Sequence, residues 1–369
     1  MRTAPPGWPP AAGPEPEVLI KEARRRQRRR YLVIGLATAV LAGAAGVTVG
    51  LARPGGHSPA RQDMRHMTHR AASSSAVPAW AMRLSGEVAY MCGDSICLMR
   101  PDRTGLHTLP ATYPERPTGP EWDGAWSPDG HRLAFRGYYG LGDGQYDLYA
   151  VGANGCHLTR LTHGVNGDSP SWSPTGRQIV FEVPLGIDVV NADGTGLRRL
   201  LIDTSRYGYT TPAWSASNRI AFVRYRYRSH LPAEIYMVNA DGSGVAPLTH
   251  GGPGSAQPSW SRTGRQIAFV AATGHSDVRG SRMVIEVANA DGTGLHRVSP
   301  RSWASYSPTW TRGGKIVFLR QIGAPTANAA APASAYIVNR DGTGLRLLYP
   351  NLDAIQIAWG PTALPPASC

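Results

Sequence analysis

A six-residue phrase rich in oxygen-bearing side chains occurs four times in the chain. It reads Asn-Ala-Asp-Gly-Thr-Gly at 191–196 and 289–294, Asn-Ala-Asp-Gly-Ser-Gly at 239–244 and Asn-Arg-Asp-Gly-Thr-Gly at 339–344. Alternating oxygen ligands followed by glycine begin the calcium loop of an EF-hand, which ends on a bidentate acidic residue at its twelfth position. The twelfth positions here are Ile202, His250, Pro300 and Pro350. None of these is acidic, so no metal or other cofactor is expected.

The same phrase is better explained as a hairpin turn. Asp-Gly is a favoured turn sequence, and asparagine tolerates a positive φ. Degenerate copies stand at 101–105 and 152–156, which raises the number of such turns to six.

A second phrase, built around tryptophan, recurs with the turns. It reads AWSPDGHRLAF at 125–135, PSWSPTGRQIVF at 170–181, PAWSASNRIAF at 212–222, PSWSRTGRQIAF at 258–269 and PTWTRGGKIVF at 308–318. Its tryptophans are Trp126, Trp172, Trp214, Trp260 and Trp310, and the series continues to Trp359. They are 42 to 50 residues apart, a period typical of propeller blades, and are predicted to pack in the core.

Each period contains four short strand signals separated by turns, as residues 256–300 illustrate. The segment 86–110 supplies only a second, third and fourth strand, and 353–360 supplies only a first strand. Together they make a sixth blade from the two ends of the repeat region, which removes open sheet edges. We therefore predict an all-β, six-bladed propeller of four-stranded antiparallel blades, closed by N- and C-terminal strands that share one blade, over 85–369.

These repeats resemble the propeller repeats of TolB and its relatives. The TolB phrase is close to PxWSPDGxxIAF followed by IYxxNxDGxG, and AWSPDGHRLAF, PSWSPTGRQIVF and EIYMVNADGSG carry the likeness best. The resemblance implies the propeller fold. It does not fix a function, because similar repeats occur in binding proteins, peptidase accessory domains and lyases. TolB also has an α/β domain before its propeller, which is not recognisable here, so its role in the Tol–Pal system is not carried over.

A binding site in such a ring is expected at the mouth where the last strand of one blade connects to the first strand of the next. Arginine and aromatic residues, which dominate binding hot spots, are frequent in these segments. The candidate ligand- or partner-binding residues are Trp122, Asp123, Asp168, Arg206, Tyr207, Tyr209, Gln257, Arg301, Trp303, Tyr306 and Asp353. Capping of the blade core by the same aromatic residues is the competing interpretation.

One longer excursion begins with arginine and tyrosine in strict alternation, from Arg224 to Arg228. On a strand this pattern places the arginines on one face and the tyrosines on the other. An anionic polymer could contact the arginine face, although a solvated strand end is the favoured interpretation.

No enzymatic motif accompanies the repeats. The sequence has no G-x-S-x-G elbow, no H-E-x-x-H motif and no P-loop. His163 and His250 occupy equivalent positions and are predicted to hydrogen-bond loop backbone. No catalytic residue is assigned, and the chain is not expected to be an enzyme.

The four cysteines suit an oxidising compartment. Cys92 and Cys97 flank a predicted hairpin turn, where a cross-strand disulfide is feasible. Cys156 and Cys369 could supply a second bridge, but sequence does not fix the pairing. A C-x4-C spacing without a companion pair argues against zinc.

The N-terminal region predicts attachment to a membrane. Tyr31 to Ala52 is an uncharged apolar stretch, long enough to cross a bilayer as a signal-anchor helix. Residues 1–30 form a Pro-rich, basic tail expected in the cytoplasm, and 53–84 form a flexible linker. The propeller would then be extracytoplasmic. Export with signal cleavage, through a twin-arginine pair at Arg28 and Arg29, is the alternative, although no clear A-x-A site follows.

The formal charge of +13 does not indicate nucleic acid, because most of the excess flanks the apolar stretch and 85–369 carries only 25 basic against 21 acidic residues. The expected function is a binding or scaffolding module for a cell-envelope protein or glycan. An envelope polysaccharide lyase or hydrolase that uses the propeller funnel is the alternative. The oligomeric state is open.

Overall fold

The computed structural model describes residues 80–81, 84–92, 95–109, 120–138, 146–227, 232–252, 254–273, 283–322, 333–352, 354 and 356–360. The predicted membrane span and the cytoplasmic tail lie outside these residues. Within them, no helix has the length and apolar character needed to cross a membrane.

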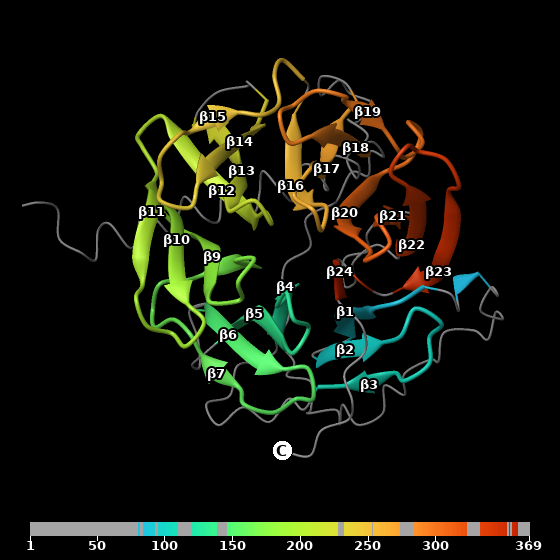
Figure 1. Cartoon of the computed structure of the whole chain (residues 1–369), viewed down its shortest axis with the longest axis horizontal. Coiled ribbons are helices and arrows are strands. Elements are labelled where there is room, and N and C mark those ends of the chain that lie inside the picture. The colour runs from blue at the N-terminus through green and yellow to red at the C-terminus, as the bar shows by residue number, and fades with distance from the viewer. Residues whose placement is uncertain are drawn as a thin grey trace, which may run out of the picture.

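The described residues form six four-stranded antiparallel sheets arranged as blades around a central axis (Figure 1). Blade 1 consists of β4 (Pro120–Trp126), β5 (Arg132–Tyr138), β6 (Tyr146–Gly152) and β7 (Thr159–Arg160). Blade 2 consists of β8 (Asp168–Trp172), β9 (Gln178–Val183), β10 (Gly186–Asn191) and β11 (Arg198–Ile202). Blade 3 consists of β12 (Tyr207–Trp214), β13 (Arg219–Arg226), β14 (Glu234–Asn239) and β15 (Ala246–Pro247).

The remaining three blades follow the same plan. Blade 4 consists of β16 (Ser255–Trp260), β17 (Gln266–Ala272), β18 (Met283–Asn289) and β19 (His296–Arg297). Blade 5 consists of β20 (Ser305–Trp310), β21 (Lys315–Gln321), β22 (Ala333–Asn339) and β23 (Arg346–Leu352). Blade 6 combines β24 (Ile357–Gly360) with β1 (Glu87–Cys92), β2 (Ser95–Met99) and β3 (His107–Thr108).

Blade 6 closes the ring as the sequence predicted. Its strand order is β24-β1-β2-β3, so the last strand of the chain pairs with the first. The antiparallel register joins Glu87 to Gly360 and Tyr90 to Ile357. This pairing leaves no unpaired inner strand between blades 5 and 1, which is the edge that an open ring would expose.

The apolar core is divided among the junctions between neighbouring blades. Six clusters of buried side chains form, one at each junction. At the junction of blades 2 and 3, for example, Val180 and Ile187 of one blade meet Trp214 and Phe222 of the other. Since a single blade buries little apolar surface by itself, stability depends on the complete ring.

The repeated tryptophans pack at these junctions and also hydrogen-bond across them. Trp172, Trp260 and Trp310 donate their indole N–H groups to backbone carbonyls of Ala125, Ala213 and Ser259 in the preceding blade, at 3.1, 3.1 and 2.9 Å. Trp214 differs, because its indole N–H binds the side chain of Asn218 within its own blade. The prediction that these tryptophans serve the core is confirmed.

The Asp-Gly phrases are turns between the third and fourth strands. In the first copy, Asp193 Oδ1 accepts bonds from the backbone N–H and the hydroxyl of Thr195, at 2.9 and 2.7 Å. Gly194 has a φ of 87° and Gly196 a φ of 64°, and a Cβ on Gly196 would lie 2.5 Å from the side-chain nitrogen Nδ2 of Asn191. The turn geometry therefore requires the glycines, and the aspartate is used by the turn itself. The other three copies repeat these bonds.

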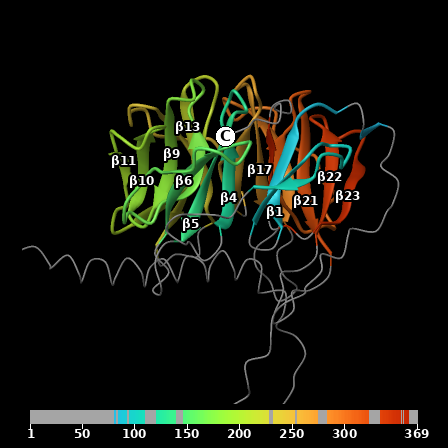
Figure 2. The same cartoon turned by 90° about the horizontal axis from the view of Figure 1, so that it is seen from below.

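Each blade has its strands running between two faces of the ring (Figure 2). The turns that join strand 1 to strand 2, and strand 3 to strand 4, lie on one face, because consecutive strands are antiparallel. We call this the turn face. The connections from strand 2 to strand 3 and from strand 4 to the next blade lie on the opposite face, which we call the mouth face. Those predicted binding residues that the structure describes belong to the mouth face.

Cys97 and Cys156 are both disulfide-bonded. In the register of β1 and β2, Cys97 pairs with Tyr90 and Cys92 pairs with Ser95, so the two cysteine positions share one face of the sheet. The bridge from Cys97 to Cys92 stays a prediction, since the described side chains do not include Cys92. The same holds for Cys369, which lies outside the described residues.

Candidate functional site at the mouth face

The predicted mouth residues fall into three groups. Asp168, Gln257, Tyr306 and Tyr209 are tied into the framework of the ring. Arg206, Tyr207, Arg301 and Trp303 are exposed or half-exposed. The side chains of Trp122 and Asp123, and the whole of Asp353, are outside the part that the structure describes.

Asp168 forms a buried ion pair across the junction of blades 1 and 2. Its Oδ2 lies 2.5 Å from Nη1 of Arg136 on β5, and the two side chains are 7% and 9% exposed. The guanidinium of Arg136 also stacks on the Tyr146 ring, 4.9 Å from the centroid. A buried charge is tolerated when it is paired, so the role of Asp168 is to join blade 2 to blade 1 through Arg136.

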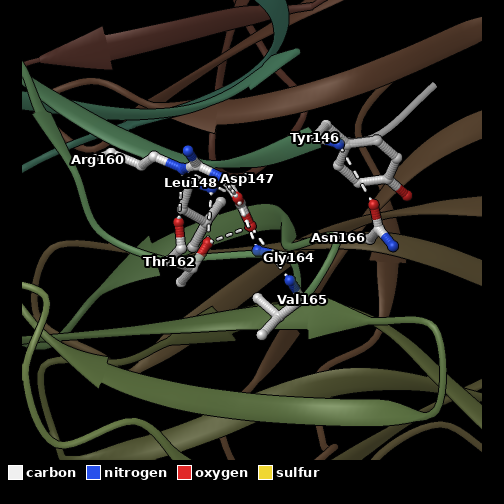
Figure 3. A network of polar contacts seen from close by, with 8 residues as sticks. All are labelled: Tyr146, Asp147, Leu148, Arg160, Thr162, Gly164, Val165 and Asn166. Atoms are coloured by element: carbon white, nitrogen blue, oxygen red, sulfur yellow. Dashed lines mark hydrogen bonds and ion pairs between the residues drawn. The ribbon is translucent and has the colours of Figure 1, made fainter. Parts of the chain in front are cut away.

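A second buried carboxylate fixes the segment that leads to Asp168 (Figure 3). Asp147 on β6 is fully buried and accepts bonds from Arg160 Nη2 at 2.7 Å and from the Thr162 hydroxyl at 2.9 Å. It also accepts the backbone N–H groups of Gly164 and Val165, at 2.9 and 3.2 Å. Asp147 thus holds the connection between blades 1 and 2 in place.

This network corrects the prediction for His163 and His250, whose side chains are exposed. The loop bonds come instead from the glycine that follows each histidine. Gly164 donates to Asp147, and Gly251 donates to Glu234 on the third strand of blade 3 at 3.1 Å. Neither histidine is therefore needed to hold its loop.

Gln257 links two blades at the inner strands. Its backbone is left-handed, with a φ of 49°, at a β-bulge of β16. Its side-chain oxygen accepts the backbone N–H of Ser307 in blade 5 at 2.9 Å. Ser169, Thr211 and Ser307 have the same left-handed backbone at equivalent bulges. Gln257 is thus part of a repeated junction.

Tyr306 is mostly buried between the clusters on either side of blade 5. Burial raises the pKa of its hydroxyl to about 12. Tyr306 therefore serves mainly to cap the core of the blade.

Blade 3 carries an arginine held between two aromatic rings. The guanidinium carbon of Arg224 on β13 lies 4.1 Å from the Tyr207 ring centroid and 4.0 Å from that of Tyr236. The guanidinium carbon of Arg206 also lies near this group, 5.4 Å from the Tyr207 ring centroid. Burial raises the pKa of Tyr209, which shares this face of the blade, while the charge of Arg224 opposes that rise.

Blade 5 repeats the arrangement at equivalent positions. The guanidinium of Arg320 on β21 lies 4.1 Å from the Trp303 ring centroid, and its Nη1 donates to the Tyr336 hydroxyl at 3.4 Å. The rings of Trp303 and Tyr336 are 4.5 Å apart. Arg224 and Arg320 each stand two residues after the phenylalanine that recurs in each repeat. Tyr207 and Trp303 each stand seven residues before the tryptophan of their repeat.

Blades 1 to 5 all have the recurring phenylalanine, but only blades 3 and 5 have an arginine two residues after it. Where blades 3 and 5 have arginine, blades 1, 2 and 4 have Gly137, Val183 and Ala271. None of these residues carries a charge. The two arginine stacks are therefore additions to the repeat, and the fold itself does not require them.

Within the described part of the chain neither Arg224 nor Arg320 forms an ion pair, although Glu234 stands opposite Arg224 in the register of β13 and β14. Stacking fixes the guanidinium plane and leaves its N–H edges to project from the rings, and such edges match carboxylate groups bidentately. Because the cation–π contacts already restrict the arginine side chain, less side-chain entropy is lost when a ligand binds. The stacks can therefore bind carboxylates.

The Arg–Tyr alternation behaves as predicted over its described residues. In the register of β12 and β13, Arg224 pairs with Tyr209 and Arg226 pairs with Tyr207, so these four residues share one face of the sheet. Tyr225 and Tyr227 lie on the other face, with ring centroids 5.3 Å apart. The Tyr227 hydroxyl donates to Asp203 at 2.7 Å, which braces the segment before β12.

Sequence reasoning missed Arg320, Tyr236 and Tyr336 as members of the site. A column-by-column alignment of the repeats would have shown that arginine follows the phenylalanine by two residues in only two blades. Arg136 was missed because its partner, Asp168, is distant in sequence, and no local pattern marks that pair. Among the described residues, no three His, Cys, Asp or Glu side chains gather in a way that could hold a metal ion.

Comparison with known proteins supports the fold. TolB from Acinetobacter baumannii superposes with a TM-score of 0.57 at 19% identity, over 75% of this chain and 67% of that one. A TolB-type protein from Agrobacterium tumefaciens gives 0.51 at 17% identity, over 76% and 91%. Hydrazine synthase of Kuenenia stuttgartiensis gives 0.56 at 12% identity, over 76% and 47%. At these identities the likeness shows a TolB-like propeller fold.

In sequence, the chain is 34% identical over 163 residues to an uncharacterized protein of Agrobacterium fabrum. The match spans 40% of this chain and about half, 54%, of that protein. No protein-family model matches the sequence.

Proposed function

We propose that the protein is a membrane-anchored, extracytoplasmic β-propeller that binds an acidic segment of a cell-envelope protein at its mouth face. The observation that carries this proposal is the pair of arginine stacks around Arg224 and Arg320. They occupy equivalent places in alternate blades, so a ligand that crosses blade 4 would meet both. A binding role also fits the TolB proteins among the structural neighbours.

An acidic protein segment fits the stacks better than a glycan. Sugar rings bind by stacking their C–H faces on open aromatic faces. Here both rings are already in contact with other side chains, Tyr207 with Arg224 and Arg206, and Trp303 with Arg320 and Tyr336. The exposed recognition elements are guanidinium edges, which select carboxylates.

Membrane attachment is supported by the sequence. The uncharged stretch from Tyr31 to Ala52 follows seven residues of which six are arginine, the arrangement that keeps an N-terminus in the cytoplasm. The disulfide bonds of Cys97 and Cys156 fit an oxidising extracytoplasmic compartment. An anchored propeller would present its binding face within the envelope.

The test compares the full chain with two variants in capture from its own solubilised envelope fraction and from a glycan panel. Arg224→Gln with Arg320→Gln removes both stacked charges, and Arg226→Gln removes a neighbouring exposed charge outside the stacks. We expect an acidic envelope protein to be retained by the wild type and the Arg226 variant and to be lost from the double variant.

Three results would contradict the proposal. One is capture that is unchanged in the double variant, and another is retention of glycans alone. The third is cleavage of envelope polysaccharide by the same preparation, which would favour the lyase or hydrolase alternative.

A further inference from the structure

The turn face carries one aliphatic side chain per blade at an equivalent position, and four of the six are exposed. Each follows an Asp-Gly turn or its degenerate copy. Leu106 is 58% exposed, Leu197 46%, Val245 46% and Leu295 56%. Leu158 and Leu345 occupy the same position in the other two blades and are half-buried. Because repeated blades place equivalent residues at one height, these side chains form a level ring at the rim of the disc.

Positive charge is concentrated on the same face. The turns of this face, with the first residue of the strand after each turn, contain twelve Arg or Lys and six Asp. The rest of residues 85–369 contains 13 Arg or Lys and 15 Asp or Glu. The propeller as a whole is nearly balanced, so its excess positive charge lies on the turn face.

The six aspartates of this face remain charged and offset half of the twelve basic residues, so a positive excess remains. Asp193, Asp241, Asp291 and Asp341 use one oxygen to accept bonds within their own turns. Several arginines of the face are exposed, among them Arg177, Arg262 and Arg265. A flat surface that combines exposed aliphatic tips with flanking basic side chains has the composition of an interfacial membrane-binding surface.

The path of the chain points to the same face. β1 is a second strand, so Glu87 begins at the turn face, and β24 is a first strand, so Gly360 ends there. The chain therefore enters and leaves the ring on this face. Any anchor that precedes residue 80 would tether the propeller by its turn face, with the mouth face directed away.

We propose that the turn face lies on an anionic lipid surface, with the aliphatic ring in the headgroup region and the arginines beside the lipid phosphates. The aliphatic ring distinguishes a lipid surface from a soluble polyanion, which would use the charges alone. This orientation leaves the mouth face open for a partner. It rests on residues that take no part in the mouth site, so either proposal can fail without the other.

The test measures amide hydrogen exchange of the full chain in nanodiscs of phosphatidylcholine, with or without phosphatidylglycerol. A contact populated about four-fifths of the time slows exchange about fivefold. We expect that slowing, in the presence of phosphatidylglycerol, in peptides that cover 103–107, 194–198, 243–246 and 293–297. Peptides of the mouth face should not change.

Two variants make the result specific. The fourfold change Leu106→Ser, Leu197→Ser, Val245→Ser and Leu295→Ser should abolish the slowing. Ile202→Ser, at the opposite end of β11 where the side chain is 65% exposed, should leave it intact. If the fourfold variant does not fold, Arg177→Gln with Arg262→Gln and Arg265→Gln should weaken the slowing instead.

Two outcomes would overturn the proposal. The first is equal exchange in both kinds of nanodisc. The second is slowing that survives the serine changes, or that soluble polyphosphate reproduces in full, because charge alone would then account for the contact.

Discussion

The indole N–H of Trp310 in blade 5 binds the carbonyl oxygen of Ser259 in blade 4, at 2.9 Å. The same bond recurs at Trp172 and Trp260. In three blades the repeated tryptophan therefore supplies both apolar packing and a directional bond to the preceding blade. The bond fixes how deeply each blade sits in the ring, which apolar contact alone would not do.

Loss of one such bond should lower the free energy of unfolding by a measurable amount. Trp310→Phe keeps an aromatic ring but leaves the Ser259 carbonyl without its partner in a buried junction. We expect the free energy of unfolding to fall by about 1–3 kcal/mol, measured by denaturant titration. Trp303→Phe, at the half-exposed mouth, is the control and should cost less. Equal effects of the two changes would show that the interblade bond contributes nothing specific.

Removal of the Asp147 charge should loosen the connection between blades 1 and 2. In Asp147→Asn the side chain has one acceptor oxygen and no charge to offset Arg160. Since loss of one partner of a buried ion pair is costly, we expect destabilisation of about 3 kcal/mol. Hydrogen exchange should also rise over 163–168. Glu234→Gln, at the equivalent position of blade 3, removes a half-exposed carboxylate and should change both quantities less. No change in exchange over 163–168 would contradict the role given to Asp147.

The four turn aspartates should make the stability of the fold depend on pH in the acidic range. Bonds from Thr195, Ser243, Thr293 and Thr343 lower the pKa values of Asp193, Asp241, Asp291 and Asp341 below the ordinary 3.8. A carboxylate whose pKa is lower in the folded state contributes stability above its unfolded pKa. That contribution is lost as the pH falls through the folded value.

The four turns should therefore lose stability together below about pH 4. Replacement of all four aspartates by asparagine keeps an acceptor oxygen and removes the titrating group. Thermal unfolding from pH 6 to pH 2 should show a shallower loss in this variant. Parallel curves for wild type and variant would mean that other carboxylates control the acid response.

The sequence predicted most of the fold because the repeat is read directly from spacing. Trp126 to Trp359 gave the blade period, and the incomplete segments at the two ends of the repeat region gave the shared blade 6. The turns were identified because Asp-Gly has a local geometric meaning. These features depend on neighbours in sequence, which a single chain displays.

The site was predicted less well, because its contacts join residues that are distant in sequence. Asp168 was selected as a mouth residue, but its buried pairing with Arg136 makes it structural. Tyr306 was selected for its aromatic ring, which packs, partly buried, against the core clusters on either side of blade 5. Tyr207 and Trp303 were selected without the arginines that stack on them, since the pairing across strands depends on register that the spacing alone did not give.

The central claim, that Arg224 and Arg320 bind carboxylates, is tested most directly by calorimetric titration of the full chain with a glutamate-rich peptide. Each lost guanidinium–carboxylate contact should weaken binding about tenfold or more. We therefore predict binding to the wild type, a loss of at least that size in Arg224→Gln with Arg320→Gln, and no loss in Arg177→Gln with Arg262→Gln on the turn face. Equal binding by both double variants, or equal binding of the glutamine analogue of the peptide, would contradict the account.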